Sequence, residues 1–140
     1  TEIMLEGITG TYEGHRFDFP GGWKEDARNA FTRSGRTDAE NEVFDYLKKL
    51  LHYRKNNTVL QSGRMKQFIP QDGIYVYFRY NNEKTVMVMA NNNEDEKNVE
   101  MSRFAEMLGG KIKATEITSG KVIDLNNVKI PAKTVWVMEL

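Results

Sequence analysis

The chain has 140 residues, and its 20 Lys and Arg balance 20 Asp and Glu, so the formal net charge is zero. That length fits one domain, or one small domain with an appendage. A neutral chain lacks the surplus of cations that binding to nucleic acid or to anionic membranes needs, so neither partner is expected. Without Cys, disulfides, thiolate zinc sites and Cys nucleophiles are excluded. No apolar run is long enough to insert into a bilayer, and no signal peptide is visible.

Residues 5–37 read as a long loop. Glycine is too frequent there for a helix or a strand interior. Loops of this length normally lie over a scaffold and carry function. The chain also starts without an initiator Met, at Thr1, so we expect it to be an interior piece of a longer protein.

Residues 38–55 are predicted to form an amphipathic helix. Thr37 and Glu40 have the spacing of a capping box at its start. The later turns are rich in Lys and Arg, which suit the negative end of the helix dipole and read as a solvated face rather than a nucleic-acid patch. The apolar side chains recur at a helical period and form one stripe: Val43, Phe44, Leu47, Leu50 and Leu51.

From Thr58 onward the apolar residues alternate as in strands. Two turns, Asp72–Gly73 and Ser119–Gly120, separate several of these segments. Residues 104–108 read as one helical turn. The predicted strands are 64–69, 74–80, 85–90, 99–102, 113–118, 121–125 and 134–139. The pattern predicts a mainly β fold: an antiparallel, Greek-key-like β-sandwich of seven or eight strands, preceded by one amphipathic α-helix and a long loop.

Two of these strands, 74–80 and 85–90, are apolar on both faces. An antiparallel sheet that meets water shows a clean polar face. We therefore expect both sides of this sheet to be covered, one by the partner sheet and the other by the helix or by a further domain.

No motif for catalysis or cofactor binding is present. The chain has no P-loop, dinucleotide fingerprint, HExxH or Ser/His/Asp triad pattern. The run Asn91–Glu96 offers oxygen ligands but lacks the alternation of a calcium loop, so it reads as a solvated hairpin end. We predict no catalytic residue, no metal ligand and no cofactor.

The stretch His15–Trp23 is the one candidate for ligand chemistry. Aromatic rings can stack on sugar rings, and a guanidinium and a carboxylate can bridge neighbouring hydroxyls. The alternative is a self-packed loop held by its own aromatic side chains.

Three segments resemble the end of the alpha-amylase family of glycoside hydrolases, in its neopullulanase and cyclomaltodextrinase-like branch. They are Thr1–Met4 (TEIM), Arg16–Trp23 (RFDFPGGW) and the helical pattern Glu40–Lys55, in this order. The stretch Ser62–Tyr80 is similar to the opening of the sandwich that follows the barrel in that family. The resemblance implies that residues 1–57 are a remnant of the (β/α)8 barrel, with a substrate-side loop at 5–37 and the last barrel helix at about 38–55. It implies that residues 58–140 are the C-terminal β-sandwich domain.

The resemblance also implies that the catalytic carboxylates lie upstream, so this chain alone is expected to be inactive. The loop contributes two substrate-binding candidates, Arg16 first and Asp18 second. We expect a structural or accessory domain of an enzyme that acts on α-glucans such as starch, pullulan or maltodextrins. The sequence does not predict the localisation, although a secreted or periplasmic location is plausible for a full-length enzyme that degrades polysaccharides.

Two alternatives belong to other classes. An independent carbohydrate-binding module could use Tyr75, Tyr77, Tyr80 and Trp136 as an aromatic platform. A protein-interaction module could pair two copies into a homodimer through the helix stripe Phe44, Leu47 and Leu51.

Overall fold

The computed structural model describes residues 10–12, 15–17 and 37–140, and it divides into two compact units, Thr1–Lys48 and Lys49–Leu140. The division lies within helix α2, whereas the domain boundary predicted from the sequence lies at 57/58. The assignment of residues 1–57 to a barrel stays a prediction. None of the helices in the described ranges is both long and apolar enough to cross a bilayer.

In the first unit, two short strands pair as an antiparallel hairpin, β1 (Gly10–Tyr12) and β2 (His15–Phe17). Helix α2 (Asp38–Lys55) then begins at the predicted residue, and the Asn41 backbone N–H donates to the Thr37 carbonyl oxygen at 2.9 Å. The hairpin lies within the stretch that was predicted as loop. The rest of that loop up to residue 36, with Asp18, lies outside the described residues.

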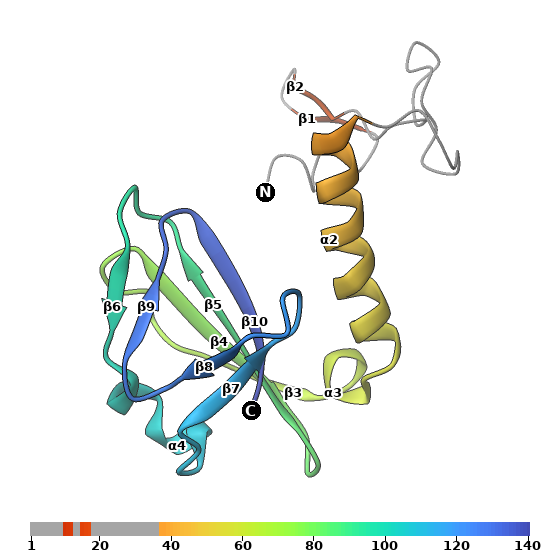
Figure 1. Ribbon diagram of the computed structural model, residues 1–140. Coiled ribbons are helices and arrows are strands. Elements are labelled where there is room, and N and C mark those ends of the chain that lie inside the picture. Colours follow the sequence, from red (N-terminus) through yellow and green to blue (C-terminus); the bar gives the residue numbers. More distant parts are fainter. Residues whose placement is uncertain (1–9, 13–14, 18–36) are drawn as a thin grey trace. The chain divides into compact units, whose positions relative to one another are not determined.

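The second unit is a β-sandwich, as predicted (Figure 1). Its larger sheet has six strands in the order β3-β4-β5-β10-β7-β8, and its smaller sheet pairs β6 with β9. The last strand, β10, lies between β5 and β7, while β9 belongs to the other sheet, which is a Greek-key type of connection. The strands are β3 (Arg64–Gln67), β4 (Ile74–Tyr80), β5 (Thr85–Asn91), β6 (Lys97–Val99), β7 (Lys113–Glu116), β8 (Val122–Asp124), β9 (Val128–Ile130) and β10 (Thr134–Glu139).

Three elements differ from the prediction. A single helical turn, α3 (Thr58–Gln61), occupies the place where alternation was expected to begin. A 3₁₀ helix, η1 (Met101–Phe104), replaces most of the strand predicted at 99–102, because Met101 and Phe104, three residues apart, both enter the core. Strand β9 was not predicted. The helical turn expected at 104–108 is present as α4 (Ala105–Leu108) and ends at Gly109, which has a φ of 58°.

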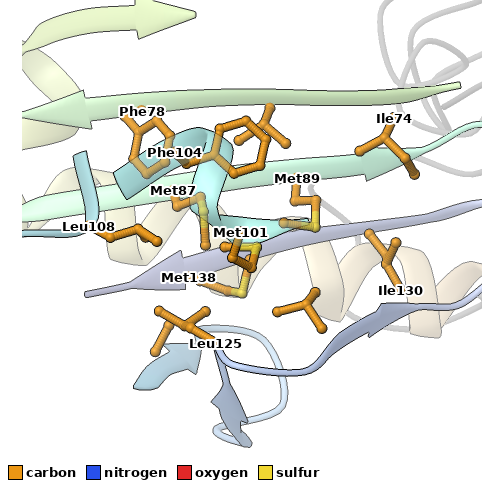
Figure 2. Close-up of a cluster of buried hydrophobic side chains, with 13 residues drawn as sticks. Ile74, Phe78, Met87, Met89, Met101, Phe104, Leu108, Leu125, Ile130 and Met138 are labelled. Atoms are coloured by element: carbon orange, nitrogen blue, oxygen red, sulfur yellow. The ribbon is translucent and has the colours of Figure 1, made fainter. Parts of the chain in front are cut away.

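The core lies between the two sheets. We call the side of the large sheet that faces it the inner face. Cross-strand register places Phe78 opposite Met87, and Met87 opposite Met138, on this face. In Figure 2 these side chains meet Met101 and Phe104, which come from the layer opposite. The inner face is therefore covered by β6, β9, η1 and α4.

Candidate functional site

The opposite side of the large sheet, here called the outer face, is the candidate functional surface. Register puts nine residues on this face of its three central strands. They are Tyr75, Tyr77 and Arg79 of β4, Val86, Val88 and Ala90 of β5, and Val135, Val137 and Glu139 of β10. Seven of the nine are apolar or aromatic, so the face needs a cover, as the sequence predicted.

One end of the outer face is covered within the second unit. Helix α3 contacts β4 and β5, and its Val59 is buried, as are Val86 and Val88 of the sheet. The last turns of α2 also lie on this face, because the Tyr53 hydroxyl donates to Glu139 of β10 at 2.5 Å. Lys49 of α2 donates to the Thr118 carbonyl oxygen at 2.9 Å. The expected cover by the helix is thus present for its final turns.

A charged network fixes this contact. Glu139 also forms an ion pair with Lys84 at 2.9 Å, and Lys84 donates to the Asn57 side-chain oxygen at 3.0 Å. Burial alone would raise the pKa of Glu139, but the hydrogen bonds from Tyr53 and Lys84 outweigh it and hold that pKa below its ordinary value. Burial, and then the hydrogen bond and charge of Glu139, raise the pKa of Tyr53. Glu139 is therefore an ionised acceptor that joins the helix end to the sheet.

Outside this cover the outer face stays accessible, at its other end around Val135 and along its β3 edge around Met65. Val135 is 44% exposed, and Met65 of β3, which pairs with Arg79, is 51% exposed. Tyr75 and Tyr77 are half-buried, with ring centroids 5.6 Å apart and planes inclined by 36°. We call Met65, Tyr75, Tyr77, Arg79, Val135 and Val137 the outer patch. Accessible apolar surface of this kind is typical of a contact site for another molecule or domain.

The predicted four-residue aromatic platform does not form. Tyr75 and Tyr77 lie on the outer face, whereas register places Tyr80 and Trp136 on the inner face. Trp136 packs against the core. Adjacent strand residues point to opposite faces, so four aromatics from mixed positions of two strands cannot share one surface.

The structure does not test the predicted substrate-binding pair. Arg16 lies in β2, where it pairs with Thr11 of β1. Asp18 lies outside the described residues, and the predicted roles of both stay predictions. Within the described ranges, no group of three or more His, Cys, Asp or Glu could hold a metal ion. The sequence reasoning also missed that Arg79 and Glu139 share the outer face, which only the strand register shows, and that Tyr53 of α2 contacts Glu139.

Comparison with known proteins assigns the family. The family model described as "Cyclo-malto-dextrinase C-terminal domain" matches residues 65–139, more than half of the chain. The chain belongs to this family. The match confirms the predicted resemblance to the C-terminal domain of alpha-amylase family enzymes, and it covers the strands that build both faces of the sandwich.

Solved structures of amylases share the fold of this cyclomaltodextrinase C-terminal domain. AmyP in complex with maltose is 12% identical, with a TM-score of 0.70, over 99% of this chain and 33% of AmyP. The alpha-amylase of Geobacillus thermoleovorans in complex with acarbose is 20% identical, with a TM-score of 0.61, over 81% of this chain and 25% of that enzyme. The maltogenic alpha-amylase AmyB of Thermotoga neapolitana is 16% identical, with a TM-score of 0.59, over 99% of this chain and 35% of AmyB. The chain spans a quarter to about a third of these proteins.

Proposed function

We propose that this chain serves as the noncatalytic C-terminal domain of a glycosidase that acts on α-glucans such as starch, pullulan or maltodextrins. The observation that carries the proposal is the family match over residues 65–139. The names of the similar structures, which include maltose and acarbose complexes of amylases, support the substrate class. Hydrolysis belongs to the catalytic domain of the full-length enzyme, and the sandwich supports that domain.

The outer patch gives this support a physical basis. Removing its accessible apolar side chains from water would stabilise a contact with another domain by about 25 cal/mol per Å² of buried apolar surface. The last turns of α2 lie on the same face, so the polypeptide enters the sandwich over its outer side. A domain that precedes α2 is well placed to cover the patch, and the sandwich then stabilises it.

The test compares the 140-residue chain with the full-length enzyme that carries it. We expect the pure chain to release no reducing sugar from starch, pullulan or cyclodextrin, while the full-length enzyme does. Val135→Asp in the full-length enzyme should lower its thermal midpoint, because it places a charge in the covered patch. Turnover by the pure chain that is lost in Asp18→Asn would overturn the proposal.

The substrate-side role of the loop is part of the same proposal. In the full-length enzyme we expect Arg16 to contact the substrate, with Asp18 second. Arg16→Ala should raise KM for maltodextrin several-fold and leave the thermal midpoint unchanged. An unchanged KM would remove Arg16 from the binding site.

A carbohydrate-binding module is the second candidate, and the paired rings of Tyr75 and Tyr77 favour it. Isothermal titration calorimetry of the chain with maltoheptaose distinguishes a sugar-binding module from a supporting domain. A patch that serves as a contact surface for another domain predicts no sugar binding at millimolar ligand. Binding that disappears in Tyr75→Ala and persists in Tyr80→Ala would support the module.

A further inference from the structure

Arg79 carries an unsatisfied donor on the outer face. Its side chain is half-buried, and its Nε is buried, with no hydrogen-bond partner in the part of the chain that the structure describes. Register places Arg79 between Met65 of β3 and Val86 of β5, and both neighbours are apolar. Among the described residues, it is the one with a buried side-chain nitrogen or oxygen that lacks a partner. Buried polar groups are rarely left unpaired, so this one calls for an explanation.

The nearby carboxylate and amide acceptors on the outer face, Glu139 and Gln67, are already occupied. Glu139, one strand beyond Val86, accepts from Tyr53 and pairs with Lys84. Gln67 of β3 pairs with Tyr77, and its side-chain oxygen accepts from the Tyr75 hydroxyl at 2.9 Å. Neither side chain binds Arg79. Within the described ranges, the chain presents the Arg79 Nε on this face without an acceptor for it.

An acceptor that arrives with a covering surface would satisfy the guanidinium. Arg offers a planar fork of donors that matches a carboxylate through two parallel hydrogen bonds. The apolar side chains of the outer patch would exclude water around such a pair, which strengthens it. A cation on the patch favours an anionic acceptor over a neutral one.

We propose that Arg79 pairs with a carboxylate of the catalytic domain that precedes α2 in the same polypeptide. The proposal rests on the proposed function, because it requires that domain to cover the outer patch. It adds the chemistry of the contact: an acidic side chain set in an apolar surface. Arg79 would then fix the register between the two domains, since one buried charge pair allows few alternative placements.

The experiment measures thermal midpoints of Arg79→Met in two contexts. In the 140-residue chain the substitution removes an unpaired buried donor, so the midpoint should rise by about 2–5 °C. In the full-length enzyme it leaves the partner carboxylate buried without its cation, so the midpoint should fall. Arg64→Met is the matched control, because Arg64 is exposed on β3 and register places it on the inner face; it should change neither midpoint.

The proposal predicts that Arg79→Met raises the thermal midpoint of the 140-residue chain and lowers that of the full-length enzyme. A fall in both contexts would overturn the proposal, because Arg79 would then act within its own domain. No change in the full-length enzyme would overturn it as well. Val135→Asp separates this failure from failure of the proposed function. If Val135→Asp destabilises the full-length enzyme while Arg79→Met does not, the patch is covered but Arg79 has no partner. If neither does, the cover itself is refuted.

Discussion

At the scale of single residues, the buried carboxylate of Glu116 organises the turn after β7. Glu116 is 3% exposed and accepts hydrogen bonds from the backbone N–H and hydroxyl groups of Thr118 and Ser119, at 2.6–3.0 Å. Burial alone would raise the pKa of Glu116, but these hydrogen bonds outweigh it and lower the pKa below its ordinary value. The same turn presents the Thr118 carbonyl oxygen to Lys49, so the carboxylate also supports the contact with α2.

We expect Glu116→Gln to lower the free energy of unfolding by about 1–3 kcal/mol at pH 7, because the amide cannot accept all of these hydrogen bonds. The folded-state pKa lies below the unfolded one. The contribution is therefore complete above the unfolded pKa and is lost as the pH falls through the folded pKa. Urea unfolding at pH 7 and pH 3 measures this. When the pH falls from 7 to 3, the free energy of unfolding should decrease less in the variant than in the wild type. An equal decrease would contradict the role given to Glu116.

A second buried polar residue, Asn91, joins the end of β5 to the segment before β10. Its amide nitrogen donates to the carbonyl oxygens of Asp95, Ile130 and Pro131 at 2.9–3.1 Å. Its oxygen accepts from the backbone and side chain of Asn93. The sequence suggested a solvated hairpin end here. Asn91 is instead 3% exposed, and its polarity serves the fold.

Asn91→Asp tests this arrangement with almost no change in shape. The introduced oxygen would face three carbonyl oxygens, so we expect a loss of about 3 kcal/mol or more at pH 7. The folded state then favours the protonated acid, which raises its pKa, and the loss should shrink as the pH falls toward 4. Chemical denaturation across this range measures it. Asn92→Asp, at an exposed neighbour, is the control, and equal effects of the two substitutions would refute the assignment.

At the scale of elements, the network of Tyr53, Glu139 and Lys84 joins α2, the β4–β5 hairpin and β10. We expect Tyr53→Phe to lower the free energy of unfolding by about 1 kcal/mol, because it removes one hydrogen bond and leaves the ring in place. A double-mutant cycle with Glu139→Gln measures the coupling, which should be of similar size. Zero coupling would show that the helix end is held by packing alone.

The sequence predicted the elements well where periodicity was long. Helix α2 has the predicted bounds, and β4 and β5 agree within one residue, because seven alternating residues leave little ambiguity. Strand β9 was missed because Val128–Ile130 gives only one period of alternation beside Pro131. The outer face was predicted to be covered, but its polar contacts were not. Arg79 and Glu139 are 60 residues apart in the sequence, and they lie on the same face only because both of their strands pair with β5.

At the scale of the whole molecule, the two faces of the large sheet have different roles. The inner face is closed by the small sheet, η1 and α4, and it builds the core. The outer face is closed at one end by α3 and the end of α2, and it leaves the outer patch accessible. The main core thus lies on the inner face, while part of the outer face stays accessible for the interdomain contact that we propose.

An uncovered outer patch should make the 140-residue chain associate with itself at high concentration. Light scattering at two concentrations should show an apparent mass that rises with concentration in the wild type and less in Val135→Asp. Ile69→Asp is the matched control, because Ile69 is 82% exposed and lies outside the large sheet. Leu51→Asp tests the helix stripe, since Leu51 is 54% exposed. Association abolished by Leu51→Asp alone would assign self-contact to the stripe predicted from the sequence, and a strictly monomeric wild type would argue against contact through either surface.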